Sequence, residues 1–265
     1  MRQVLGRKST SKNSDWLKAL ANIQSLVSEQ EVDDAVNNAV DDIKTVCAGK
    51  EVAYGWSGGK DSMVLRYICE KAGIKKSFLG LSELDFPEFR QWCLQNAPAG
   101  CTIIETPRTY QFLKEHPNCL FPNHKDRDAG STMLIYGPQW TFKRYFELYP
   151  ETDIILVGHR TLDGNIPGRS NMLRNSKGVV RYSPIAKWTH ELILATMVYK
   201  GLPFAPNYFY YNGFVNGTHC WNDTVGIDTI EQGWRYVWGI DKSIVHRAAE
   251  YDIQGARQWL TSHTE

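Results

Sequence analysis

The chain has 265 residues, a hydrophobic content of 42%, a charged content of 22% and a formal net charge of +1. These values are ordinary for a soluble globular protein and allow one large α/β domain with a sizeable core. Basic and acidic residues nearly balance, so the composition gives no sign of a nucleic-acid-binding surface. No apolar run is long enough for a membrane span, and the start lacks a signal peptide's apolar stretch, which favours a cytoplasmic location.

Two helices are predicted ahead of the first strand, after a polar and basic start that we expect to be loosely ordered. Ser14 is expected to cap the first helix, which carries Trp16 on its apolar face. The second helix is expected to end before Gly49. We therefore assign residues 1–48 to an N-terminal tail with helices.

Strands and helices then alternate along the middle of the chain. Apolar runs predict strands at residues 52–56, 77–81, 102–104, 154–157 and 179–182. The helical spacing of apolar residues predicts helices at 61–72, 88–95, 110–115, 130–148 and 189–200. This order is typical of a doubly wound, mainly parallel α/β sheet with helices on both faces, and we assign residues 49–200 to that core.

The last part of the chain is less regular. Residues 201–222 are rich in Pro, Tyr, Asn and Gly and are predicted to form a long loop. Two closing helices are predicted, one around Trp234 and one that Asp241 caps and that extends to Trp259. We assign residues 201–265 to an aromatic loop and C-terminal helices that pack on the core.

A short glycine-rich loop follows the first strand of the predicted sheet and opens a helix. Its sequence is Ser-Gly-Gly-Lys-Asp-Ser. Two glycines allow a tight turn, and successive amide N–H groups together with the first turn of a helix attract an anion. The spacing differs from that of the Walker loop, and a plain surface turn is the alternative interpretation. We predict that nucleotide phosphates bind to Ser57, Gly58, Gly59, Lys60, Asp61 and Ser62.

Arginines follow another strand end of the predicted sheet. Gly158, His159 and Arg160 come directly after the strand at 154–157, and Arg169 and Arg174 lie in the glycine-containing loop beyond it. Ligands of open parallel sheets bind beyond the carboxyl ends of the strands, and a guanidinium pairs bidentately with phosphate or sulfate. We expect the arginines to clamp an anion, whereas a solvated loop is the alternative. The histidine is either an acid or cation at the site or a packed side chain.

Carboxylates and cysteines add further hypotheses. Asp61 or Asp85 is a candidate ligand of Mg²⁺, which binds through few carboxylates plus substrate phosphates. The six cysteines contain no Cys-x-x-Cys pair, so we expect reduced thiols and no iron–sulfur cluster. Cys220 lies beside His219, which makes it a candidate nucleophile.

Five segments resemble the phosphoadenosine phosphosulfate (PAPS) reductase family of the PP-loop group, which also includes the small, adenylylating subunit of bacterial ATP sulfurylase. In chain order they are Tyr54–Ser62, Phe86-Pro87-Glu88, Val157–Arg160, Ser183–Thr189 and Leu202–Tyr208. The resemblance implies an adenine nucleotide alpha-hydrolase-like fold and a bound ATP or adenosine phosphosulfate. Through the matching motifs it also implies nucleotide contacts at Phe86, Gly158 and Trp188.

The departures from that family bear on the reaction. The reductases carry a catalytic cysteine in a Glu-Cys-Gly-Leu-His tail, whereas no cysteine follows Cys220 in this chain. Attack on sulfonate sulfur needs a thiolate. The resemblance therefore implies the fold and nucleotide binding, but not the reductase reaction.

Nucleotidyl activation with release of pyrophosphate is our preferred hypothesis, with Lys60, Arg160 and Arg169 as catalytic residues and Mg²⁺ as a companion of the nucleotide. The first alternative is a thiol-dependent PAPS or adenosine phosphosulfate reductase that uses Cys220. The second is a nucleotide-binding subunit that acts only with a protein partner or as a homo-oligomer, or a component of sulfur or nucleic-acid modification.

Overall fold

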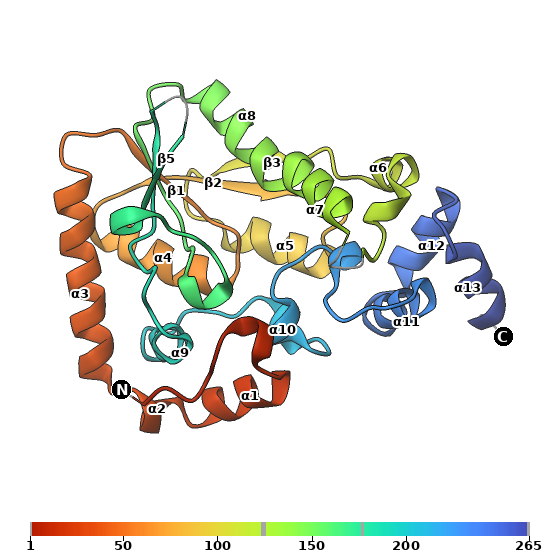
Figure 1. The fold of residues 1–265 in the computed structure, drawn as a ribbon, viewed down its shortest axis with the longest axis horizontal. Coiled ribbons are helices and arrows are strands. Elements are labelled where there is room, and N and C mark those ends of the chain that lie inside the picture. The colour runs from red at the N-terminus through yellow and green to blue at the C-terminus, as the bar shows by residue number, and fades with distance from the viewer. Residues whose placement is uncertain (1, 123–125, 176–177, 264–265) are drawn as a thin grey trace. The chain divides into compact units, whose positions relative to one another are not determined.

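The computed structural model describes residues 2–122, 126–175 and 178–263 (Figure 1). Within these residues the strands are β1 Val52–Gly55, β2 Lys76–Leu81, β3 Thr102–Glu105, β4 Ile154–Leu156, β5 Met172–Arg174 and β6 Val180–Tyr182. They form one sheet in the order β3-β2-β1-β4-β6-β5. β1 pairs in parallel with β2 and β4, and β4 with β6, whereas β5 runs antiparallel to β6. The predicted α/β fold with a mainly parallel sheet is confirmed.

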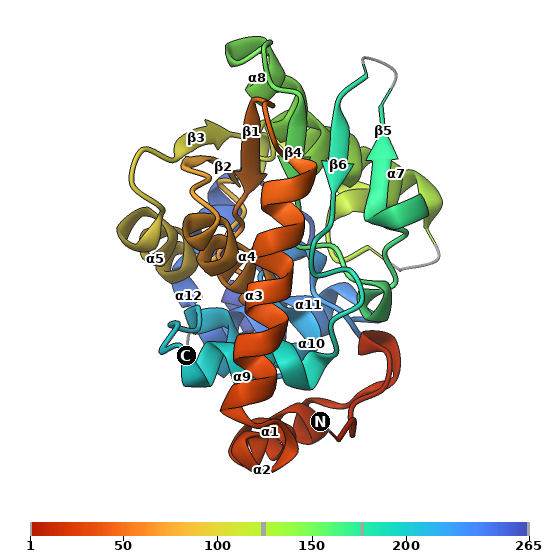
Figure 2. The same cartoon turned by 90° about the vertical axis from the view of Figure 1, so that its left-hand side faces the viewer.

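The central strands of the sheet are buried, which explains why their sequences are continuous apolar runs. All three residues of β4 are buried, and β1 pairs with β4 in a register that sets Val52 opposite Ile154. Strands buried on both faces carry continuous apolar runs rather than an alternating pattern. Figure 2 shows β1, β4, β6 and β5 side by side.

The predicted helices are present, with small shifts at their ends. Their bounds in the described residues are α1 Asn13–Ala21, α2 Ile23–Leu26, α3 Glu29–Val46, α4 Lys60–Lys71, α5 Pro87–Asn96, α6 Tyr110–Glu115, α7 Arg127–Leu134, α8 Trp140–Leu148, α9 His190–Tyr199, α10 Gly213–Asn216, α11 Ile230–Ile240, α12 Lys242–Glu250 and α13 Ala256–His263. A π-helical turn with Pro138 inside it joins α7 to α8, where the sequence predicted one continuous helix.

Several local predictions were wrong. Ser14 lies inside α1, whose N-cap is Lys12, and the predicted long loop at 201–222 contains the short helix α10. The predicted arginine loop contains the short edge strand β5, and the predicted last helix is two helices, α12 and α13. The break between them contains Asp252 and Gly255 at φ values of 58° and 78°, which a continuing helix does not allow. The start of the chain is docked rather than loosely ordered, since Leu5 is 2% exposed.

The chain divides into two compact units whose segments alternate along the sequence. Unit 1 comprises Met1–Leu79, Cys93–Thr102 and Phe146–Gly217, and unit 2 comprises Gly80–Trp92, Ile103–Tyr145 and Thr218–Glu265. In unit 1, α3, α4 and α9 pack on one another, whereas in unit 2 α12 packs on α11 and α13. The three-part division predicted along the sequence stays a prediction.

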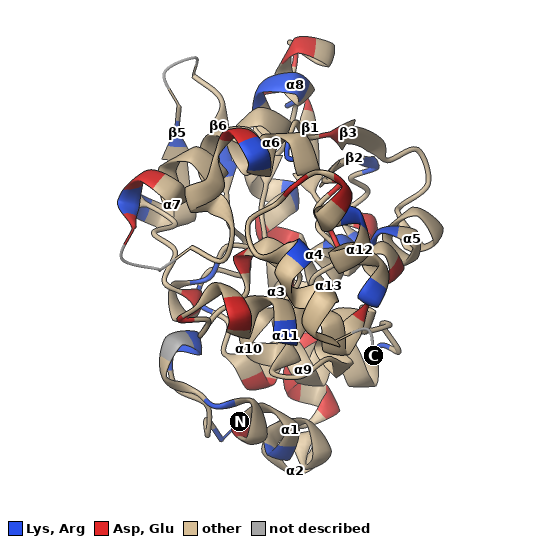
Figure 3. Cartoon of the chain, turned by 90° about the vertical axis from the view of Figure 1, so that its right-hand side faces the viewer, with Lys and Arg blue, Asp and Glu red and all other residues tan. Residues whose placement is uncertain are grey.

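Charged residues of both signs are interspersed along the helices, as α7 and α12 show in Figure 3. This distribution agrees with the near-neutral composition. No helix in the described ranges combines the length and the apolar character that crossing a membrane requires.

Candidate functional site

The glycine-rich loop of unit 1 connects β1 to α4. Gly58 has a φ of 67°, a left-handed conformation that only glycine adopts without strain. Gly59 is the N-cap of α4 and, as a glycine, makes no capping hydrogen bond with a side chain. Ser57 donates its backbone N–H to Ser62 Oγ at 3.1 Å, and the Ser62 hydroxyl donates to the Gly59 carbonyl at 2.9 Å. The loop is therefore held by hydrogen bonds of its own, and the start of the helix presents backbone N–H groups and a partial positive charge.

Lys60 stands at the first position of α4 and is almost fully buried. Its Nζ lies 2.7 Å from Asp61 Oδ2 and 5.2 Å from the centre of the Trp16 ring. Its backbone N–H donates to the Tyr208 hydroxyl at 2.8 Å. A buried ammonium paired with one carboxylate and one aromatic face is held in a single place beside the loop.

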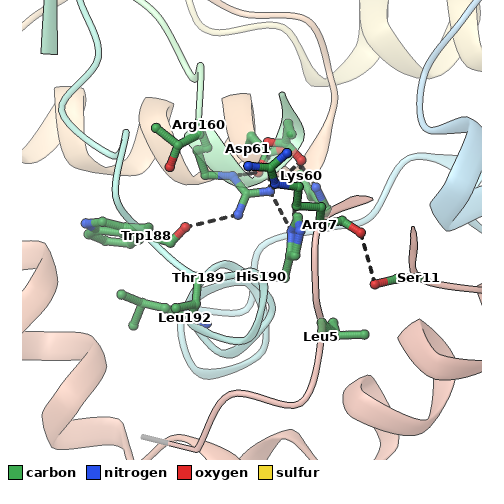
Figure 4. A network of polar contacts seen from close by, with 12 residues as sticks. Leu5, Arg7, Ser11, Lys60, Asp61, Arg160, Trp188, Thr189, His190 and Leu192 are labelled. Carbon is green, nitrogen blue, oxygen red and sulfur yellow. Dashed lines mark hydrogen bonds and ion pairs between the residues drawn. The ribbon is translucent and has the colours of Figure 1, made fainter. Parts of the chain in front are cut away.

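Arg160 follows β4 and is the centre of a polar network (Figure 4). Its Nε lies 2.7 Å from Asp61 Oδ1, and its Nη2 lies 2.9 Å from Asp163 Oδ2. Nη1 donates to the Trp188 carbonyl at 3.2 Å, and Nη2 lies 2.9 Å from His190 Nδ1. The guanidinium is 0% exposed. It therefore holds the start of α4, the exit of β4 and the start of α9 together.

The charges of this network determine which of its groups carry protons. Burial raises the pKa of Asp61, but the cations Lys60 and Arg160 outweigh it and hold that pKa below its usual range. Burial and the neighbouring Asp61 raise the pKa of Asp163. Burial, with Arg160 and Lys60 nearby, lowers the pKa of His190 to about 3. Because an arginine can only donate, His190 Nδ1 accepts its hydrogen bond and the neutral ring carries its proton on Nε2.

Gly158 brings the exit of β4 close to the loop. A Cβ at this position would lie 3.3 Å from the carbonyl carbon of Asp61. A side chain there would push α4 away, so the glycine permits a close backbone approach rather than an unusual conformation. The pKa of His159 is lowered by burial and by Arg181, which favours the neutral ring over the cation considered above.

The other two predicted anion-binding arginines lie at the surface. Arg169 begins a short 3-10 turn, Arg169–Asn171, and is exposed. Arg174 ends β5 and donates from Nη1 to the Gly178 carbonyl at 2.7 Å. Within the described residues, neither side chain forms a hydrogen bond or ion pair with the network around Arg160. Their contact with a nucleotide stays a prediction.

Asp85, Phe86 and Cys220 belong to unit 2. The Ser82 N–H donates to Asp85 Oδ2 at 2.7 Å, and the Cys220 thiol donates to Asp85 Oδ1 at 3.2 Å. Burial raises the pKa of the carboxyl and raises that of the thiol strongly. Phe86 is buried, with its ring edge toward Tyr236. Cys220 is therefore a protonated thiol in this conformation rather than a thiolate.

The carboxylates predicted to bind Mg²⁺ are engaged by groups of the protein itself in this structure. Both oxygens of Asp61 are engaged by cations, and both oxygens of Asp85 accept hydrogen bonds. Within the described part of the chain, no three His, Cys, Asp or Glu side chains gather where they could hold a metal ion. The magnesium roles of the two residues stay predictions.

Sequence reasoning missed the contribution of the N-terminal region. Trp16 was assigned to a core face, yet its ring lies 4.4 Å from that of His190 as well as over Lys60. Tyr208, the last residue of the segment Leu202–Tyr208, accepts a hydrogen bond from the backbone N–H of Lys60 with its hydroxyl. No local pattern indicates either contact, because both partners are distant in the sequence.

Comparisons with known proteins agree with this fold. No protein-family model matches the chain. It is 24% identical over 169 residues to flavin adenine dinucleotide synthase of Saccharomyces cerevisiae, a match that covers 60% of this chain and 53% of that protein. It is 29% identical over 143 residues to the tRNA-specific 2-thiouridylase MnmA of Shewanella pealeana, covering 49% of this chain and 38% of that protein. The match thus spans about half of the first relative and less of the second.

A solved structure carries the comparison further. The PAPS reductase of Candida auris, in a phosphate complex, superposes with a TM-score of 0.53 at 14% identity, covering 75% of this chain and 98% of that chain. Together with the sheet order, this likeness shows that the chain has a mainly parallel α/β fold like that of the PAPS reductase. The resemblance to the PAPS reductase family of the PP-loop group is thereby confirmed for the fold.

Proposed function

We propose that unit 1 binds the phosphates of an adenine nucleotide, either ATP or an adenosine phosphosulfate, at the loop of residues 57–62. The observation that carries the proposal is the start of α4, with glycine as its N-cap, behind the left-handed Gly58, with the buried ammonium of Lys60 beside it. Backbone donors and a fixed cation around one small loop are what a phosphate group requires. The amide of Lys60, which now donates to Tyr208, is a further donor that a ligand would compete for.

The reaction we propose is nucleotidyl activation. An oxyanion of the acceptor attacks the α-phosphorus of ATP and forms a new P–O bond. The bond to the bridging α,β-oxygen breaks, and its electron pair leaves with pyrophosphate. Lys60 and the loop amides neutralise the departing pyrophosphate, and Arg160 positions Asp61 and α4 rather than contacting the nucleotide in this conformation. Arg169 and Arg174 are exposed and remain the proposed contacts of the reacting anion.

The names of the relatives favour this chemistry over reduction. A synthase of flavin adenine dinucleotide makes a product that contains an adenylyl group. The reductase alternative needs a thiolate, whereas burial holds the Cys220 thiol protonated against Asp85. No observation in the described residues favours a particular protein partner or a nucleic-acid substrate.

The test supplies the protein with ATP as its Mg²⁺ salt and sulfate, and separately with phosphoadenosine phosphosulfate and reduced thioredoxin. Products are resolved as AMP, adenylylated acceptor, pyrophosphate and sulfite. We expect calorimetric binding of ATP, and pyrophosphate once an acceptor is present. Binding of neither nucleotide would remove the proposed function.

Lys60→Ala tests the assigned site within that function. We expect nucleotide affinity to fall by at least about 1.5 kcal/mol, the low end for a hydrogen bond to a charged group. Lys71→Ala is the matched control, since Lys71 is an exposed lysine in the last turn of the same helix. Equal affinities of the two variants in calorimetry would place the nucleotide elsewhere.

A further inference from the structure

The N-terminal segment, residues 2–12, is anchored to the rest of unit 1 by its backbone. The N–H groups of Val4 and Leu5 both donate to Glu191 Oε1, at 2.7 Å and 2.6 Å. Arg2 donates its N–H to the Leu26 carbonyl at 2.8 Å. The side chain of Leu5 is buried. A polar start that composition predicts to be loose is therefore held by one carboxylate and one buried leucine.

The anchoring carboxylate connects this segment to the polar network. Glu191 is 0% exposed and follows His190 in the first turn of α9. A buried carboxylate that accepts two backbone N–H groups forms charge-assisted hydrogen bonds, so it defines where the segment runs. In Figure 4, Leu5, Arg7 and Ser11 are drawn in the same close-up as Lys60, Arg160 and His190.

The segment brings a third cation to the network. The turn Lys8–Thr10 packs on the turn Thr161–Asp163. Lys8 lies close enough to interact electrostatically with Lys60, Arg160, Asp61 and Asp163. A Cβ on Gly217 would lie 3.3 Å from Lys8 Nζ, so the bare glycine backbone makes room for the ammonium.

Three cations gather at this place. Lys8, Lys60 and Arg160 face the carboxylates of Asp61 and Asp163. These two carboxylates are already paired with Lys60 and Arg160. The neighbouring carboxylate of Glu191 is engaged by the N–H groups of Val4 and Leu5. Among the described residues, Lys8 Nζ makes no ion pair or hydrogen bond of its own. Burial and the neighbouring cations lower its pKa, so its charge is costly until an anion arrives.

We propose that Lys8 is a ligand of the anionic group of the nucleotide, delivered to the loop of residues 57–62 by the Glu191-anchored N-terminal segment. The inference rests on the proposed function and adds to it a residue from a distant part of the chain. The ligand class is a phosphate or phosphosulfate ester, because one ammonium beside a second ammonium and the backbone donors at the start of a helix matches a multiply charged oxyanion. Arg160, in contrast, is paired with the carboxylates of Asp61 and Asp163 and donates to the Trp188 carbonyl.

The first test is Lys8→Met, which keeps the length of the side chain and removes its charge. The control is Lys18→Met on α1, an exposed lysine of the same region. We expect calorimetry to show ATP binding about tenfold weaker in Lys8→Met, from the low end for charge-assisted hydrogen bonds, and unchanged in the control. Melting temperatures without nucleotide report whether either variant is folded.

The outcomes separate this inference from the proposed function. If the wild type binds ATP and Lys60→Ala loses affinity while Lys8→Met binds as well as the wild type, the role of Lys8 is overturned and the proposed function stands. If the wild type binds neither ATP nor phosphoadenosine phosphosulfate, the proposed function fails first and the inference fails with it.

Glu191→Gln tests whether the segment delivers the lysine. The amide keeps the shape but removes the charge that holds two N–H groups, so the segment is held less firmly. We expect Glu191→Gln to weaken ATP binding in the wild-type background and to add little in the Lys8→Met background. Equal losses of affinity in both backgrounds would show that Glu191 acts independently of Lys8. The claim that the anchored segment brings Lys8 to the loop would then be overturned.

Discussion

Asp61 of unit 1 and Asp85 of unit 2 are the same residue type after neighbouring strands, yet their surroundings push their pKa values in opposite directions. Asp61 touches two cations, which hold its pKa below the usual range despite burial. Asp85 touches a backbone N–H and a thiol, and burial raises its pKa. The charge state of a buried carboxyl follows its partners rather than its burial alone.

The difference between Asp61 and Asp85 bears on the two reactions that the sequence allowed, nucleotidyl activation and thiol-dependent reduction. The site in unit 1 is rich in cations and suits an anionic ligand. The pair in unit 2 couples an acid to a thiol: burial and the neighbouring Asp85 raise the pKa of the Cys220 thiol, and burial raises the pKa of Asp85. The comparison therefore favours our proposal that nucleotide chemistry belongs with the loop of unit 1, whereas the thiol of unit 2 donates a hydrogen bond to its carboxyl.

Asp61→Asn is expected to have the largest effect of the substitutions that test the difference between Asp61 and Asp85. Removing this charge leaves Lys60 without its carboxylate and Arg160 with only Asp163 as an acidic partner. We expect a loss of about 3 kcal/mol in the free energy of unfolding, the low end for breaking a buried ion pair. Denaturant titration at neutral pH measures it.

Asp85→Asn is the matched control for that experiment. The amide oxygen still accepts from Ser82, and the amide nitrogen still reaches the sulfur of Cys220. We expect a loss below about 1 kcal/mol, since the hydrogen bonds survive and Asp85 forms no direct ion pair among the described residues. Similar losses in the two variants would mean that the two carboxyls do not differ in the way described.

The strands and the loop after β1 were predictable because their signals are local. Continuous apolar runs mark β1 and β4, and the two glycines mark the turn between β1 and α4. The edge strand β5 was not predictable, because three residues in an arginine-containing loop gain their pairing only from β6.

The finer parts of the site depend on contacts that no local pattern encodes. Glu191 accepts the N–H of Val4 from 187 residues away, and Cys220 meets Asp85 across 135 residues. The sequence predicted Arg160 correctly as a residue of the strand exit. It did not predict that protein carboxylates and a neutral histidine contact its guanidinium.

The neutral state of His190 in unit 1 predicts how the free energy of unfolding depends on pH. Burial and Arg160 lower its pKa from 6.5 to about 3, so below pH 6.5 the unfolded chain takes up a proton that the folded chain refuses. Stability that is fully present above pH 6.5 is therefore lost as the pH falls toward 3. We expect the free energy of unfolding to fall by up to about 1.4 kcal/mol per pH unit from this residue.

His190→Asn isolates that contribution, because the amide oxygen can accept from Arg160 as Nδ1 does. Denaturant titrations at pH 6.5 and one unit lower should show a shallower decline in the variant than in the wild type. Parallel declines would mean that His190 titrates normally in the folded chain.

Cys220→Ser is expected to have the smallest effect on activity, and it tests the comparison on the side of unit 2. The serine hydroxyl can donate to Asp85 as the thiol does, so we expect nucleotide binding and turnover to match the wild type.

In the native protein, a thiol reagent should label the partly exposed Cys101 before the buried Cys220, because burial raises the pKa of the Cys220 thiol strongly. A Cys101→Ser variant identifies the fast-reacting thiol in that assay.

One result would contradict the activity expected of Cys220→Ser. It is sulfite release from phosphoadenosine phosphosulfate by the wild type that the Cys220→Ser variant does not show. That outcome would require a conformation in which Cys220 leaves Asp85 and ionises, and it would make the thiol of unit 2, rather than the loop of unit 1, the centre of the chemistry.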